Sequence, residues 1–452
     1  MKSSSTQENP LGILPVNQLL ARFAIPSIIA MLVSALYNMV DQFFIGHSVG
    51  MLGNAATNVA FPLNTTCTAI ALLFGIGGAA NFNLCMGAGR EDEARRYLGT
   101  AVSMLVICGL ALCLIVNIFL EPMMKAFGAT DDVLGYALTY TGITAFGFPF
   151  VILATGGGHL IRADGSPKFS MVCMLTGAVL NTILDPLFIF VFDWGIAGAA
   201  WATVIGQVIS ASIAAWYLAH YKTVTLRLAD LKPKVRDCLQ ILSLGMAPCF
   251  NQLAMMVVQI TMNNVLTSYG ALSSYGSEIP LACAGIIAKV SMIFFSFVIG
   301  ISQGLQPITS FNYGAQKGRR VKESFWLALG AATAISTLAF LVFQIFPRQI
   351  IALFGSGSED YFRFAEQYFR IFLFFTFLNG IQPISSNFFT SIGKAKLGVF
   401  LSLTRQIIFL LPLILLLPVF MGIDGVMYAG PIADLAAALL AGVLILREMK
   451  KL

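Results

Sequence analysis

Twelve long apolar runs limit what this chain can fold into more than any other feature of its sequence. A membrane-spanning helix needs about 20 mostly apolar residues, and each run is long enough to form one. Only 11% of the side chains are charged, whereas about a quarter is usual in soluble domains. The sequence therefore predicts an all-α integral membrane protein with twelve transmembrane helices. The runs cover residues 19–43, 55–80, 97–120, 134–155, 169–192, 197–219, 241–266, 280–304, 325–346, 364–386, 398–420 and 425–446.

Short motifs recur between the two halves of the chain and divide the spans into six plus six. The matching segments are GIAGAAWA (195–202) with GIDGVMYA (422–429), GAGREDEA (87–94) with GAQKGRRV (314–321), and ADGSPK (163–168) with SIGKAK (391–396). Because each half has an even number of spans, the two repeats run parallel in the membrane, an arrangement known in transporters. We expect two six-helix bundles around a central cavity.

The distribution of polar and basic residues predicts the domain boundaries and the orientation. Most of the 27 Lys and Arg residues fall at the termini or in connections on the same side, while the opposite loops hold only Lys125 and Arg348. Basic loops stay inside, so both termini are expected to be cytoplasmic, and the net charge of +6 reflects topology rather than binding to nucleic acid. The expected parts are a cytoplasmic N-terminal tail (1–18), an N-terminal bundle (19–220), a cytoplasmic linker (221–237), a C-terminal bundle (238–446) and a C-terminal tail (447–452).

Asp41 is a carboxylate within a span that is otherwise apolar or small from Phe23 to Phe44, apart from Asn38 and Gln42. A charge at the centre of a span costs about 2.5–3.5 kcal/mol on insertion scales, so such residues usually face a cavity and have a function there. The alternative is that Asp41 lies near the outer end of its helix and is simply hydrated.

The fifth and sixth spans carry further oxygen-bearing side chains at helical spacing. Asn181 and Asp185 are four residues apart and share a helix face, and Thr203 and Gln207 repeat this spacing in the next span. With Asp41 they form an all-oxygen set, which suits a proton or a hard cation and does not suit zinc or copper. The alternative is that these side chains only join helices through hydrogen bonds.

The second half is equipped differently, with Lys289, Arg405 and Asp434 inside its spans. A lone buried charge is costly and is usually paired, so we expect Asp434 to pair with Arg405 or Lys289 as a structural tie. Leu413 stands where the repeat would place a second Asp185. The acidic set is therefore not duplicated, and function is expected to be concentrated in the first half.

Searches for the motifs of other protein classes find nothing. The sequence has no GxxxxGK[ST] phosphate loop, no HxxxH or HExxH metal pattern and no GxSxG nucleophile elbow. The eight cysteines are scattered without a CxxC pair and are expected to be packing residues rather than disulfides or a metal site. We therefore expect neither an enzyme nor a built-in ATPase.

Several motifs together match a known family. They are YNMVDQFFIGH (37–47), NFNLCMGAGREDEARR (81–96) and LIRADGSPK (160–168), with second-half echoes FNYGAQKGRR (311–320) and SIGKAK (391–396). In these motifs and in its six-plus-six spans, the chain resembles the multidrug and toxic compound extrusion (MATE) transporters along essentially its whole length. It is most similar to their MepA-type bacterial branch.

The resemblance implies a V-shaped pair of six-helix bundles that alternates between inward and outward openings. It places the family's coupling-cation and substrate site on Asp41, Asn181, Asp185 and Thr203. It also assigns a helix-bending role to Pro26. The family tyrosine four residues before the acid falls on Tyr37, which we expect, with Asn38 and Gln207, to line the substrate cavity.

The function implied is an antiporter that exports small cationic amphipathic drugs or metabolites in exchange for H+ or Na+, with no cofactor besides that ion. The four site residues would act as metal ligands only if the ion is sodium. Such a protein would lie among the lipids of the bacterial inner membrane, and it is expected to be a monomer. The alternatives are a lipid-linked oligosaccharide flippase of the same superfamily, whose cavity would carry several Lys and Arg residues, and a channel.

Overall fold

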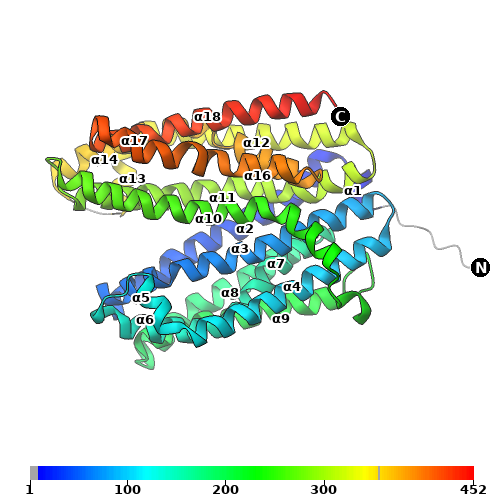
Figure 1. Ribbon diagram of the computed structural model, residues 1–452, viewed down its shortest axis with the longest axis horizontal. Helices are drawn as coiled ribbons and strands as arrows, with labels where there is room; N and C mark the ends of the chain where they lie inside the picture. Colours follow the sequence, from blue (N-terminus) through cyan, green and yellow to red (C-terminus); the bar gives the residue numbers. More distant parts are fainter. Residues whose placement is uncertain (1–8, 355–356) are drawn as a thin grey trace, which may run out of the picture.

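The computed structural model describes residues 9–354 and 357–452, and in this part of the chain every regular element is a helix. Figure 1 shows two bundles lying side by side. The first contains α2 (Val16–Ser48), α3 (Met51–Gly87), α4 (Glu91–Ile118), α5 (Leu120–Ala126), α6 (Asp131–Thr144), η1 (Ala145–Gly147), α7 (Phe148–Ala163), α8 (Pro167–Pro186), η2 (Leu187–Val191) and α9 (Gly195–Ala219). The second contains α10 (Val235–Ala271), α11 (Glu278–Gly314), α12 (Gly318–Ile345), α13 (Pro347–Phe354), α14 (Glu359–Phe372), η4 (Thr376–Leu378), α15 (Ile381–Ser391), α16 (Ala395–Leu403), η5 (Thr404–Leu410), α17 (Leu411–Met421) and α18 (Ile423–Met449). Two short helices precede the bundles, α1 (Pro10–Ile13) and η3 (Leu228–Leu231).

The internal repeat is visible in the backbone itself. Helices α3 and α11 both have 37 residues, α4 and α12 both have 28, and α6 and α14 both have 14. Left-handed backbone conformations recur at matching places, such as Gly165 and Gly393, both at φ 80°. The same holds for Gly195 (φ 56°) and Gly422 (φ 62°). The expected two six-helix bundles in a parallel repeat are therefore confirmed.

Among the described residues, eleven helical stretches are continuous and apolar enough to cross a membrane, and the tenth expected span (364–386) is broken. It consists of α14, η4 and α15, separated by short turns. In the break the hydroxyl of Thr376 donates to the carbonyl of Leu373 at 2.7 Å, and Asn379 and Gly380 follow. Such side chains compete with the helix for backbone partners, and glycine is a poor helix former, so the helix restarts at Ile381.

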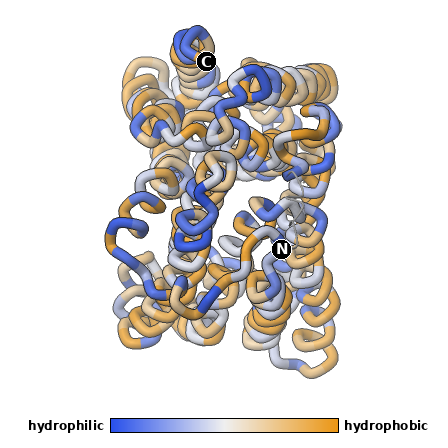
Figure 2. Tube along the Cα trace, turned by 90° about the vertical axis from the view of Figure 1, so that its right-hand side faces the viewer, coloured by the Kyte–Doolittle hydropathy of each residue, from blue (hydrophilic) through white to orange (hydrophobic). Residues whose placement is uncertain are grey.

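Helix α1, the first described helix, and the C-terminal end of α18 lie at the same end of the molecule (Figure 1). Lys317 donates to the carbonyl of Gly12, and Gly318 lies close to the carbonyl of Leu452. Figure 2 looks at this end and shows hydrophilic segments among its connections, with mostly hydrophobic helices behind them. This arrangement agrees with a multi-pass membrane protein whose termini share one side, which we call the termini end.

Two glycines bring the bundles into backbone contact near the repeat axis. A Cβ atom on Gly87 of α3 would collide with the backbone of Phe311 in α11, and one on Gly314 of α11 would collide with the backbone of Leu84 in α3. Gly87 and Gly314 are repeat counterparts, so the two contacts are related by the axis.

The same kind of close crossing joins α3 to α10 and α11 to α2. Gly77 lies against the backbone of Ile241, and its counterpart Gly304 lies against the backbone of Ala24. All these contacts belong to the termini half of the helices. Figure 1 shows the bundles diverging toward the opposite end, so the molecule has the expected V shape with its closed side at the termini end.

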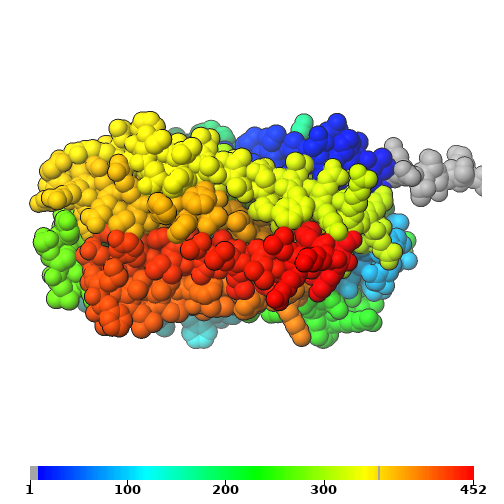
Figure 3. All heavy atoms as spheres, turned by 90° about the horizontal axis from the view of Figure 1, so that it is seen from above, coloured from blue at the N-terminus to red at the C-terminus, as the bar shows by residue number. Residues whose placement is uncertain are grey.

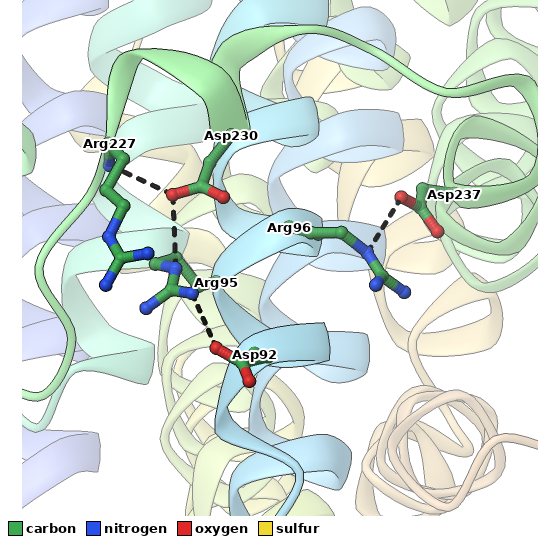
Figure 4. Close-up of polar contacts among 6 residues, drawn as sticks. All are labelled: Asp92, Arg95, Arg96, Arg227, Asp230 and Asp237. Atoms are coloured by element: carbon green, nitrogen blue, oxygen red, sulfur yellow. Dashed lines mark hydrogen bonds and ion pairs between the residues drawn. The ribbon is translucent and has the colours of Figure 1, made fainter.

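The segment before α10 docks on the first bundle. In η3, the carboxylate of Asp230 lies 3.1 Å from Nε of Arg95 on α4, and the carbonyl of Leu231 accepts a 2.6 Å hydrogen bond from Ser103. Figure 4 shows the ion pair, together with the backbone N–H of Arg227 that Asp230 also binds. The segment leading into the second bundle is therefore held by the first.

The segment before α2 docks in the reverse sense. Lys317 donates to the carbonyl of Gly12 at 2.8 Å, and Arg320 donates to the carbonyl of Leu14 at 2.6 Å. Both cations lie at the start of α12 in the second bundle. Each bundle thus binds the leading segment of the other, residues 10–14 and residues 228–231, which we call the two leading segments.

A third contact at this end joins the bundles directly. Arg96 of α4 lies 3.5 Å from the buried carboxylate of Asp237 on α10 (Figure 4). The linker is also anchored at its start, where Asp164 accepts backbone hydrogen bonds from Lys222 (2.8 Å) and Thr223 (3.0 Å). Burial raises the pKa of Asp164, although the hydrogen bonds it accepts oppose that shift.

We expect Arg95→Glu to release the leading segment at 228–231. The change places two carboxylates together where an ion pair existed, and a pair of this kind contributes up to about 1 kcal/mol, which corresponds to roughly fivefold in the open population. Chymotrypsin should cleave after the leucines between residues 226 and 231 faster by that factor. Arg95→Glu combined with Asp230→Arg should restore the wild-type resistance to chymotrypsin. The control Glu93→Gln removes the Arg90–Glu93 pair within α4 and should leave cleavage unchanged.

Candidate functional site

Three of the expected site residues form one hydrogen-bonded group between α8 and α9. The amide of Asn181 lies 3.4 Å from the carboxylate of Asp185 and 3.2 Å from Oγ1 of Thr203. Exchanging the amide oxygen and nitrogen of Asn181 keeps both contacts, with 3.1 Å to Asp185 and 3.2 Å to Thr203. Asp185 is fully buried and Asn181 is 3% exposed, so the group lies in the interior of the first bundle.

Asp41 reaches this group from α2. Its carboxyl group lies within electrostatic range of that of Asp185. One oxygen of Asp41, Oδ1, is buried and accepts no hydrogen bond from any residue that the structure describes. Two ionised carboxylates that lie near each other repel, and a shared proton or a small cation relieves the repulsion. We call the four side chains of this group the oxygen cluster: Asp41, Asn181, Asp185 and Thr203.

A cavity of about 110 Å³ opens next to the oxygen cluster. Tyr37, Asn181, Thr203 and Gln207 line it, and Oε1 of Gln207 is buried without a hydrogen-bond partner in the described structure. A water molecule takes about 30 Å³, so the cavity has room for a cation and a few waters and is too small for an amphipathic drug. A drug would have to bind in a wider space that continues from it.

Asn38 is placed differently from the other expected cavity residues. Its side chain is exposed and donates to the carbonyl of Ser34 at 2.7 Å, within its own helix. It does not line the cavity that holds Tyr37 and Gln207. The structure therefore brings six of the seven expected cation and cavity residues together and leaves Asn38 on the surface of α2.

Prolines shape the helices that carry the two carboxylates. Pro186 follows Asp185 directly and removes one backbone hydrogen bond, and the helix continues as the π-helical turn η2, a distortion common at functional sites. Pro26 lies buried inside α2, where it removes a backbone hydrogen bond of that helix, between Ala24 and Ile28, which Gly304 and Gly300 of α11 approach closely. The expected bending position is thus at the level where α2 packs against α11.

Tyr140 on α6 belongs to this site and was not expected from the sequence. It is 5% exposed and lies within electrostatic range of Asp41, Tyr37 and Asp185. Nothing in the run around it distinguishes it from the other eleven tyrosines of the chain. Only the packing of α6 beside α9 brings it to the oxygen cluster.

The second bundle has no equivalent acidic group. Arg405 pairs with the buried carboxylate of Asp434 at 2.6 Å, which confirms the expected ion pair; its purely structural role stays a prediction. Lys289 is exposed on α11 and makes no ion pair with a described residue. Leu413, the counterpart of Asp185, packs against the hydrophobic core, so the oxygen cluster is confined to the first bundle.

The chemistry of the cluster limits which ions it could hold. Two carboxylates, one amide and one hydroxyl provide only oxygen ligands, which fits a proton or sodium. Within the described part of the chain no group of three or more His, Cys, Asp or Glu residues could bind a metal. All eight cysteines lie in that part and are free, so they form no disulfides.

Comparison with known proteins gives the same picture. A family model described as MatE matches residues 26–187 and 249–416. The "Multidrug export protein MepA" of Staphylococcus aureus MSSA476 is 24% identical over 432 residues, covering 94% of this chain and 93% of that protein. The MepA of Staphylococcus saprophyticus is 24% identical over 424 residues, covering 93% and 91%.

Solved structures share the fold along almost the full length. A multidrug resistance MATE family transporter of the MOP superfamily in an outward-facing conformation superposes with a TM-score of 0.90 at 21% identity, covering 99% of both chains. A MOP superfamily transporter from Pyrococcus furiosus, described as having a binding pocket of reverse polarity, also gives 0.90 at 21% identity, covering 98% and 97%. With both halves matched by the family model, the chain belongs to the MatE family of membrane transporters.

Proposed function

We propose that this protein exports small cationic amphipathic compounds in exchange for H+ or Na+, and that the oxygen cluster binds the coupling ion. The relatives named for multidrug export support the class of substrate. The observation that carries the coupling proposal is that Asp41, with a buried Oδ1 that has no hydrogen-bond partner in the described structure, lies within electrostatic range of the buried Asp185, because two neighbouring carboxyl groups inside a membrane bundle need a positive charge between them.

The mechanism follows from competition for the same negative charge. A cationic substrate and the coupling ion each neutralise the carboxyl pair, so binding one displaces the other. Coupling requires that the substrate and the ion differ in their affinities for the inward-open and outward-open conformations of the protein. One charge that moves through 100 mV supplies about 2.3 kcal/mol, enough for roughly fortyfold accumulation of substrate.

The competing function is a lipid-linked oligosaccharide flippase, whose pyrophosphate substrate would require a basic cavity. The cavity beside the oxygen cluster has no Lys or Arg in its lining, and Arg405 is already neutralised by Asp434. The site therefore favours cations over a pyrophosphate group. A channel is the third candidate, and it would not accumulate substrate against a gradient.

Purified protein in liposomes tests the proposal. Ethidium movement would be followed by fluorescence while a pH gradient or a sodium gradient is imposed separately, with no other energy source. We expect uphill movement with one gradient, which would also identify the ion. Dye movement that ignores both gradients would contradict coupled export and return the flippase to consideration, whereas purely downhill movement would indicate a channel.

A further inference from the structure

A groove outside the oxygen cluster lies on the second bundle. Its volume is about 580 Å³, and it is lined by Arg370 and Phe374 from the broken tenth span, Gln344 of α12, and Tyr428, Ile432 and Leu439 of α18. Helices α12 and α18 lie along the face shown in Figure 3, which points away from the first bundle. In a membrane protein this face meets lipid.

The groove has one charged residue, and that residue has no partner. Arg370 is exposed, and its guanidinium makes no hydrogen bond or ion pair with any residue between 9 and 354 or between 357 and 452. By contrast, Arg348 at the same end of the bundle pairs with Glu359. An unpaired guanidinium at the flank of a membrane protein is well suited to bind a phosphate group, which it contacts with two parallel hydrogen bonds.

The position of Arg370 corresponds to the end of the spans. Its carbonyl accepts a 2.9 Å hydrogen bond from Gln344, which is the second-last residue of α12. Arg370 is therefore level with the place where α12 leaves the membrane, at the end opposite the termini. A phosphate bound there would lie at the depth of the lipid headgroups.

The length of the groove fits one acyl chain. Along α18 it runs from Tyr428 to Leu439, eleven residues or about 16 Å at 1.5 Å per residue. Half of a hydrocarbon core of about 30 Å is about 15 Å. Apart from Arg370 and Gln344 the lining is almost entirely apolar, so water would be unfavourable in it and an acyl chain favourable.

We propose that this groove is a binding site for a membrane phospholipid of the leaflet opposite the termini, with its phosphate on Arg370 and one acyl chain between α18 and the C-terminal end of α14 with the turn that follows it (residues 370–375). The lipid would fill the gap that the break in the tenth span leaves on the outer face of the bundle. This inference depends on the fold and not on the proposed export function.

Photolabelling tests the site. The full-length protein would be placed in phosphatidylcholine nanodiscs with a small fraction of phosphatidylglycerol that carries a photoreactive group in its acyl chain. We expect labelled peptides to contain residues 371–375 and 428–439. Arg370→Gln should reduce labelling of these peptides by at least about fivefold, and Ala436→Trp, which fills the groove, should reduce it similarly.

The controls separate this site from general attraction to the surface. Arg363 is another exposed arginine of α14 but does not line the groove, and Arg363→Gln should leave labelling near the wild-type level. Excess inorganic phosphate should not displace the lipid, because phosphate alone lacks the acyl chain. Equal loss in Arg363→Gln, unchanged labelling in Ala436→Trp, or displacement by phosphate would each overturn the proposal, and all variants would be checked for monodisperse elution.

Discussion

Asp41→Asn and Asp185→Asn are each expected to lower gradient-driven ethidium export at least tenfold. Either change leaves a single carboxylate in the oxygen cluster, whereas the proposed coupling site needs two carboxylates to hold a positive charge between them. An asparagine can still donate and accept hydrogen bonds but cannot exchange a proton or carry the charge that attracts a cation. Transport in liposomes under the effective gradient, measured at equal protein density, checks this expectation.

Stability separates this role from a purely structural one. If the carboxyl pair holds an ion, removing one of two repelling groups should leave the thermal unfolding temperature unchanged or raise it. If Asp185 only joins helices through Asn181, Asp185→Asn should lower the unfolding temperature. Asp41→Asn should then change neither the unfolding temperature nor the rate of ethidium export. Asp193→Asn is a matched control: Asp193 is exposed at φ 56°, a conformation that asparagine tolerates, and its change should affect neither transport nor stability.

Arg405→Met is expected to destabilise the second bundle strongly. Asp434 is 1% exposed in its side chain and pairs with Arg405 at 2.6 Å, so the change leaves a buried carboxylate without a cation. Breaking a buried pair from one side costs about 3–5 kcal/mol. We expect a large fall in the unfolding temperature, which can be measured with a thiol-reactive dye because the chain has free buried cysteines.

The double variant makes this prediction specific. Arg405→Met with Asp434→Leu removes both charges, and replacing a buried pair with apolar residues is often neutral or stabilising. The double variant should therefore recover most of the lost stability and retain coupled export. Export lost in the double variant despite normal stability would mean that the Arg405–Asp434 pair takes part in transport and is more than a structural tie.

The sequence was sufficient to predict the repeat and all four residues of the oxygen cluster. Asp41, Asn181, Asp185 and Thr203 stand out because a polar side chain inside an apolar run is energetically costly, and helical spacing then groups them by face. The same cost predicts that Asp434 pairs with Arg405 or Lys289, and the structure shows that the partner is Arg405. These predictions succeed because hydrocarbon removes the alternative partners that water offers in soluble proteins.

Other features depend on packing that no local pattern reveals. Tyr140 resembles every other tyrosine in an apolar run until α6 packs beside the cluster. Asn38 is one turn from Asp41 yet lies on the exposed face of α2, because helical proximity does not specify which side a neighbour covers. The break in the tenth span has local causes in Thr376, Asn379 and Gly380, but the apolar residues around them still predict a continuous helix.

The two leading segments have a consequence for the energy of the conformational cycle. Each bundle binds the leading segment of the other. Separating the bundles at the termini end must therefore detach residues 10–14 and residues 228–231 together, whereas separating them at the far end detaches neither. The two openings therefore differ in cost before any ligand binds. If the protein alternates between these openings as proposed, we expect the unloaded form to favour the opening at the far end, and the free energy of ion or substrate binding would have to supply the difference.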